Sequence, residues 1–96
     1  MRNRRTQSLK EVLADWIRSS KLEGPLARGR VLSVWEDLLS DQMRQHVGKA
    51  WIRGDKLFVP VTSAVWRQEL HLRREEWRKR LNEEIGTEAI SEIVFR

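Results

Sequence analysis

The chain has 96 residues, a length that fits one small domain with a single modest core. It contains no cysteine, which excludes disulfide bonds, a thiolate nucleophile and a cysteine-based zinc site. It also lacks an apolar run long enough for a secretory signal or a membrane span, so we expect a soluble, cytoplasmic protein with no membrane partner.

Positive charge is concentrated in parts of the chain. Nineteen Lys and Arg against fourteen Asp and Glu give a net charge of +5, and fourteen of the nineteen are arginine. Residues 1–30 and 67–82 carry the basic excess, whereas residues 83–96 are acidic. Clustered arginines bind phosphates through paired hydrogen bonds and release counterions. The pattern favours a polyanionic partner, with an ordinary charged surface as the alternative.

Residues 1–7 are predicted to form a basic flexible arm, because the arginines there have no apolar neighbours to bury. Residues 8–96 are predicted to form one domain. The sequence from Ser8 to Glu11 matches a capping box, and apolar residues with helical spacing follow it. We expect one helix from about 9 to 19 and a second from about 26 to 39, which could continue through Met43.

The hydrophobic period changes from 3.6 to 2 at Ala50. Gly54-Asp55 is typical of a two-residue hairpin loop, and it predicts these cross-strand pairs: Arg53 with Lys56, Ile52 with Leu57, Trp51 with Phe58, and Ala50 with Val59. One face of this hairpin is apolar. The other combines basic and aromatic side chains, namely Lys49, Trp51, Arg53, Lys56 and Phe58. Pro60 should end the pairing or lie on an edge.

A third helix is predicted from about 64 to 86, beginning after Thr62-Ser63 and ending at Gly86. Beside its apolar stripe lies a predicted basic ridge of Arg67, His71, Arg74 and Arg78. A strand over 89–95 follows. The order α-α-β-β-α-β predicts an α+β domain with helices packed on one face of a three-stranded sheet.

Catalytic machinery is not evident in the sequence. His46 and His71 are the only histidines, and no carboxylate stands at a metal-ligand spacing from either. Gly48-Lys49 resembles the end of a phosphate-binding loop, but Ala50 occupies the required Ser/Thr position. We therefore expect no enzyme, no cofactor, no metal and no small-molecule substrate.

Several motifs between Trp35 and Phe95 stand in a distinctive order. Trp35 lies near the end of a helix, His46 follows, and then come GDKLFVPV, TSAVWRQEL, LNEEIG and a terminal IVF strand. Together they resemble the DciA family, formerly a family of unknown function, whose members load or operate the hexameric bacterial replicative DNA helicase. The resemblance implies a KH-like domain, ATP-independent helicase loading and affinity for DNA, single-stranded DNA especially.

This chain departs from the usual family pattern at Ser40, where members have glycine, and at Val47, where they have threonine. It also lacks the Gly-x-x-Gly loop with which KH domains clamp nucleic acid.

The favoured hypothesis is a non-enzymatic, nucleic-acid-binding accessory factor of the replicative helicase. Its predicted binding residues are Arg67, Arg74, Arg78, Lys49, Trp51, Arg53, Lys56, Phe58, Arg4 and Arg5. Two alternatives are an RNA-binding KH-like protein and a protein-interaction module that uses the Trp51/Phe58 face. A further possibility is that the first helix or the arm covers this pair. We expect core positions for the other tryptophans: Trp16, Trp35, Trp66 and Trp77.

Overall fold

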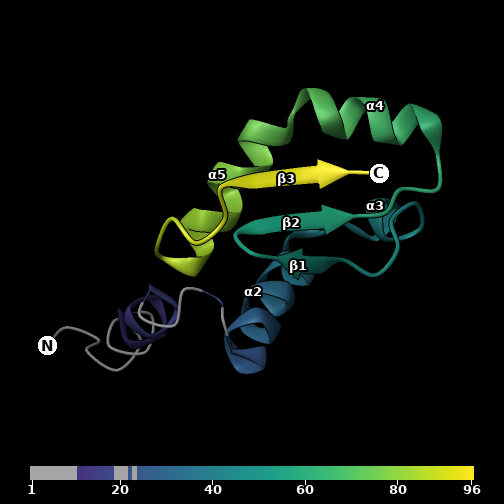
Figure 1. Cartoon of the computed structure of the whole chain (residues 1–96). Coiled ribbons are helices and arrows are strands. Elements are labelled where there is room, and N and C mark those ends of the chain that lie inside the picture. The colour runs from purple at the N-terminus through teal and green to yellow at the C-terminus, as the bar shows by residue number, and fades with distance from the viewer. Residues whose placement is uncertain (1–10, 19–21, 23) are drawn as a thin grey trace, which may run out of the picture.

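The computed structural model describes residues 11–18, 22 and 24–96, and its elements follow the predicted order (Figure 1). Residues 11–18 are helical. The elements after them are α2 (Pro25–Leu38), α3 (Asp41–Arg44), β1 (Trp51–Arg53), β2 (Lys56–Val59), α4 (Ala64–Leu72), α5 (Arg74–Ile85) and β3 (Glu92–Phe95). The α+β class and the three-stranded sheet are confirmed. The predicted arm and the capping box at Ser8 lie outside the described residues.

The sheet has the strand order β1-β2-β3, with β1 antiparallel to β2 and β2 parallel to β3. Three predicted hairpin pairs are confirmed: Trp51 with Phe58, Ile52 with Leu57, and Arg53 with Lys56. Gly54 lies in the turn with φ of 64°, a conformation that glycine adopts without steric cost. The turn residues therefore set the register of the hairpin.

The fourth predicted pair, Ala50 with Val59, is not among the pairs of this hairpin, which end at Trp51 and Phe58. Farther from the turn, Val47 forms an isolated antiparallel bridge with Val61, and the segment from 48 to 50 is one residue longer than the segment from 59 to 60 that lies opposite it. Pro60 cannot donate a hydrogen bond, and its carbonyl accepts one from Gly48 N at 2.8 Å. As predicted, the regular pairing of β2 ends before Pro60.

The helices differ from prediction in two places. The second helix ends at Leu38 because Leu39 is extended, and Ser40 then caps the separate short helix α3 by accepting a hydrogen bond from Met43 N. The single helix expected over 64–86 is two helices, which meet at Arg73 with φ of −105° and ψ of 17°. A straight helix of that length would span about 33 Å, whereas a four-residue strand covers about 13 Å, so the break lets both halves pack on β3.

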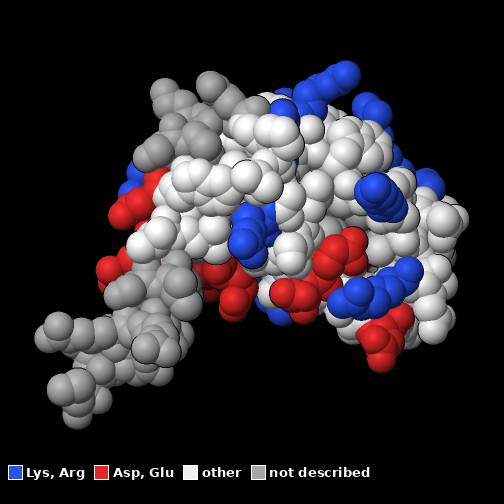
Figure 2. Space-filling model, turned by 90° about the horizontal axis from the view of Figure 1, so that it is seen from below, with Lys and Arg blue, Asp and Glu red and all other residues white. Residues whose placement is uncertain are grey.

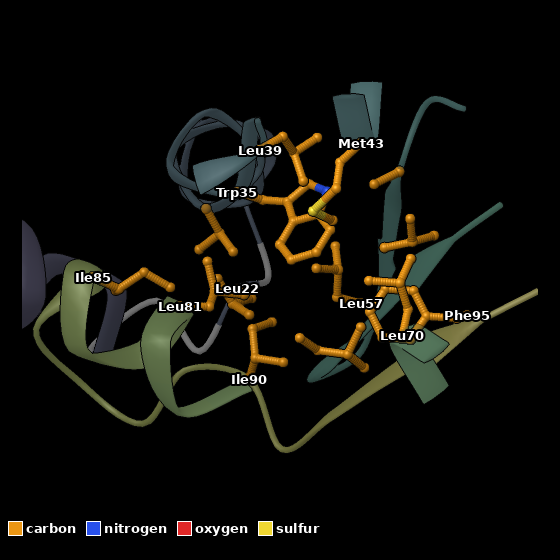
Figure 3. Close-up of a cluster of buried hydrophobic side chains, with 14 of the residues drawn as sticks. Leu22, Trp35, Leu39, Met43, Leu57, Leu70, Leu81, Ile85, Ile90 and Phe95 are labelled. Carbon is orange, nitrogen blue, oxygen red and sulfur yellow. The ribbon is translucent and has the colours of Figure 1, made fainter. Parts of the chain in front are cut away.

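The core lies between the sheet and the helices, with Trp35 at its centre (Figure 3). Trp35 is fully buried, and its ring lies 5.6 Å from the ring of Trp77 and 6.2 Å from that of Phe95. The inward residues of β2 and β3 are buried against it: Leu57, Val59, Ile93 and Phe95. The apolar face predicted for the hairpin is therefore the face that the helices cover.

The predicted core positions of the remaining tryptophans are only partly confirmed. Trp66 and Trp77 are half-buried at the edge of the core. Trp16 is 38% exposed, so its predicted core position is wrong. The helix at 11–18 buries Ala14 and Ile17 instead, which leaves Trp16 on a neighbouring side of the helix. An apolar spacing alone does not show which part of a wide stripe is covered.

The loop between α5 and β3 is held by Asn82, a buried polar residue. Its Oδ1 accepts a hydrogen bond from Ile90 N at 3.0 Å, and its Nδ2 donates to Ile90 O at 2.8 Å and to Glu88 at 3.1 Å. Both backbone groups of the buried Ile90 are thus satisfied by one side chain. Asn82 thus ties α5 to the segment that leads into β3.

Replacing Asn82 by alanine should reduce the free energy of unfolding, because Ile90 N–H and C=O would be buried without partners. Each such group costs about 1–3 kcal/mol. Urea denaturation of Asn82→Ala measures the loss, with Glu83→Ala at the exposed neighbouring position as the matched control. A loss no larger than that of the control would show that Asn82 does not hold the loop.

Candidate nucleic-acid interface

One face of the sheet is left open by the helices. In Figure 1 the helices lie behind or beside the three strands, and the helix at 11–18 lies away from the front of the sheet. The open sheet face is the name we give to the outward side chains of the three strands and their flanks: Lys49, Trp51, Arg53, Lys56, Phe58, Glu92, Val94 and Arg96. Trp51 is 41% exposed there, and Phe58 is half-buried. Among the described residues, no helix covers this pair.

An aromatic and cationic ladder crosses the open sheet face. The rings of Trp51 and Phe58 are stacked with centroids 5.5 Å apart and an angle of 7° between their planes. On β3's side, the Arg96 guanidinium carbon lies 5.2 Å from the centroid of the Phe58 ring. Because β1 is an edge strand, the end of this ladder at Trp51 is free of a neighbouring strand. A further flat ring could stack on Trp51 and extend the ladder.

The cations of the open sheet face differ in their pairing. Lys56 Nζ lies 3.3 Å from a carboxylate oxygen of Glu92, which is paired with Lys56 in the parallel pairing of β2 with β3. Both side chains are about half exposed. Lys49 and Arg53 are exposed and form no ion pair with any described residue. These two side chains can therefore pair with phosphates without first breaking an internal contact.

The predicted helical ridge is divided between two helices and is partly engaged in internal contacts. Arg67, on α4, is half-buried and donates from Nη2 to Val61 O at 2.9 Å. Arg74, at the start of α5, donates to His71 O at 2.9 Å and so binds a carbonyl at the end of α4. Arg67 thus ties α4 to the segment that precedes it, and Arg74 ties α5 to the last turn of α4.

Arg78 is largely enclosed, with a side chain only 17% exposed. It pairs with Glu75 at 3.2 Å and with Glu88 at 3.0 Å, and so joins α5 to the loop that Asn82 holds. The hydrogen bonds that Glu75 accepts from Arg78 hold the pKa of that carboxyl below its usual value. The same contact raises the pKa of Arg78.

Arg4 and Arg5 lie outside the described residues, so their predicted role stays a prediction. Arg96 was missed by sequence reasoning, although a signal was present: outward alternation from Glu92 through Val94 places Arg96 on the same face.

Seen from below, basic and acidic side chains are interspersed (Figure 2). On that side of the molecule, positive charge therefore does not form a continuous patch.

Within the described ranges, no three His, Cys, Asp or Glu side chains gather where they could hold a metal ion. In the same part of the chain, no helix is both long and apolar enough to cross a bilayer.

The comparisons with known proteins agree with the motif order between Trp35 and Phe95. The family model described as "Dna[CI] antecedent, DciA" matches residues 8–95. The chain belongs to the DciA family. At the family level, DciA proteins are associated with loading of the replicative DnaB helicase.

A curated DciA-family relative, the UPF0232 protein of Corynebacterium glutamicum (strain R), is 29% identical over 90 residues. The match covers 94% of this chain but 51% of the relative, so the chain spans about half the relative's length. No solved structure matches, and the KH-like fold stays a prediction.

Trp51 and Trp35 should respond very differently to truncation. Trp51→Ala should cost about 0.2–1 kcal/mol of folding free energy, as expected for an exposed cross-strand pair. Trp35→Ala should cost about 3–5 kcal/mol because it opens a cavity in the core. Chemical denaturation of both variants tests this difference, and similar losses would show that Trp51 is a core residue.

Acidification should weaken the Glu75–Arg78 contact. Folding lowers the pKa of the Glu75 carboxyl, because the charged carboxylate accepts hydrogen bonds from Arg78. The contact therefore stabilises the fold fully at a pH above the pKa of Glu75 in the unfolded chain. This stabilisation is lost as the pH falls through the pKa of Glu75 in the folded protein. Between about pH 6 and about pH 3, wild type should therefore lose more stability than Glu75→Gln. Glu76→Gln, at an exposed position that forms no ion pair with any described residue, is the control. Parallel pH profiles for wild type and Glu75→Gln would refute this link.

Proposed function

We propose that this DciA-family protein is a non-enzymatic accessory factor of the replicative DNA helicase and binds nucleic acid through its open sheet face. The ladder of Trp51, Phe58 and Arg96 is the observation that carries the proposal. Its free end is bordered by Arg53 and Lys49, which have no carboxylate partners among the described residues. Stacking surface and unpaired cations together are what a nucleic-acid strand requires.

Single-stranded DNA is the favoured ligand. A base can stack on Trp51 only if it is unpaired and free to leave its own stack, whereas duplex bases are already stacked on one another. The helicase association of the DciA family is the reason to favour DNA over RNA. The face itself has no feature that distinguishes a 2′-hydroxyl, so RNA is the second ligand to test.

Helicase loading by this protein is proposed to proceed without ATP. The only segment that resembles a phosphate-binding loop, Gly48-Lys49, fails at Ala50 and leads into the hairpin instead of a helix. The free energy that drives loading would then come from binding of this protein to the helicase and to the DNA strand.

A labelled single-stranded DNA of about 20 nucleotides tests the proposed interface by fluorescence anisotropy at several salt concentrations. Wild type should bind more weakly as salt rises, with a slope of about 0.7 for each phosphate contacted. Trp51→Ala should weaken binding by about 1–3 kcal/mol with little change in that slope. Arg53→Ala should lower the slope by about 0.7 if the guanidinium contacts one phosphate.

The matched control for Arg53→Ala is Lys79→Ala, which removes an exposed cation on α5. A single-stranded RNA of the same sequence and a duplex DNA separate the ligand classes. Absence of binding at low salt, or equal binding by wild type and Trp51→Ala, would rule out the open sheet face as the interface.

A further inference from the structure

A second surface feature lies on the helix side of the sheet. Residues of α3, α4 and α5, with Arg73 between the last two, line a hollow of about 410 Å³, which we call the α4–α5 groove. Met43 and Leu70 are buried and form its floor, and the half-buried rings of Trp66 and Trp77 are exposed to it. A groove of this size accommodates a large apolar side chain.

An exposed apolar edge runs along α4 beside the groove. Val65, which lines the groove, is 74% exposed, and Leu72 is 68% exposed. They are seven residues apart, so they lie two turns apart on nearly the same side of the helix. Large apolar side chains that continue a hydrophobic groove onto the surface are typical of protein-binding sites.

The charges of the groove argue against a nucleic acid as its occupant. Glu69 and Arg73 both line it, one helical turn apart, and neither forms an ion pair with any described residue. One carboxylate and one guanidinium give no net attraction for a phosphodiester chain. They complement a protein segment that carries a base opposite Glu69 and an acid opposite Arg73.

We infer that the α4–α5 groove binds an amphipathic helix of a partner protein. One apolar side chain of that helix inserts between Trp66 and Trp77, and others, spaced by three, four or seven residues, pack on Val65 and Leu72. The identity of the partner rests on the proposed function: the helix belongs to the replicative helicase. The protein then holds the DNA strand on the open sheet face and the helicase on the helix side.

The purified hexameric replicative helicase of the same organism, titrated against the labelled full chain, tests this inference. Val65→Asp and Leu72→Asp should each weaken helicase binding by at least about 10-fold, because a carboxylate replaces an apolar contact. Both positions are exposed, so the fold should persist. Val12→Asp, at another exposed valine, is the matched control and should bind as wild type.

Binding to single-stranded DNA separates the two proposals. The groove variants should keep wild-type affinity for the oligonucleotide, and Trp51→Ala should keep wild-type affinity for the helicase. If wild type binds the helicase and both groove variants bind equally well, the groove inference is wrong and the proposed function stands. If wild type does not bind the helicase, both proposals are wrong about the partner. Loss of oligonucleotide binding in a folded groove variant would also overturn the inference.

Discussion

The alternation of side chains along three short strands is the constraint on which the rest of the structure depends. Leu57, Val59, Ile93 and Phe95 point to one side and are buried under the helices. The residues between them must then point to the other side. A chain of this size has one core and buries only one sheet face, so Trp51 and Phe58 are placed outside it by the same geometry that completes the core. The open sheet face is thus a consequence of the fold.

The two sides of the sheet present different chemistry. On the open side, stacked rings and cations without carboxylate partners suit a flexible polyanion. On the helix side, the break at Arg73 separates α4 from α5 and leaves an apolar groove with balanced charge, which suits a protein helix. Three of the arginines belong to neither surface. Arg67, Arg74 and Arg78 bind carbonyls or carboxylates within the protein and hold helices and loops in place. Net charge alone therefore does not locate a binding surface.

Local signals in the sequence predicted the hairpin and the order of the elements. Gly54-Asp55 and the period of two predicted three hairpin pairs, and the helical spacing around Trp35 predicted a core residue. Long-range features gave no comparable signal. A straight helix and two shorter ones have the same apolar spacing, so the break at Arg73 could not be read from it. The contact of Arg96 with Phe58 depends on the parallel pairing of β2 with β3, which no local pattern specifies. The hydrogen bonds of Asn82 with Ile90 depend on the path of the loop between α5 and β3, which the apolar spacing does not specify either.

The five tryptophan indole N–H groups should give separate nuclear magnetic resonance signals, which makes them direct reporters of where a strand binds. Titration of the ¹⁵N-labelled protein with single-stranded DNA should shift the Trp51 signal strongly and leave that of the buried Trp35 unchanged. Shifts confined to Trp66 and Trp77, with Trp51 unmoved, would contradict the account, because they would place the strand in the groove and not on the open sheet face.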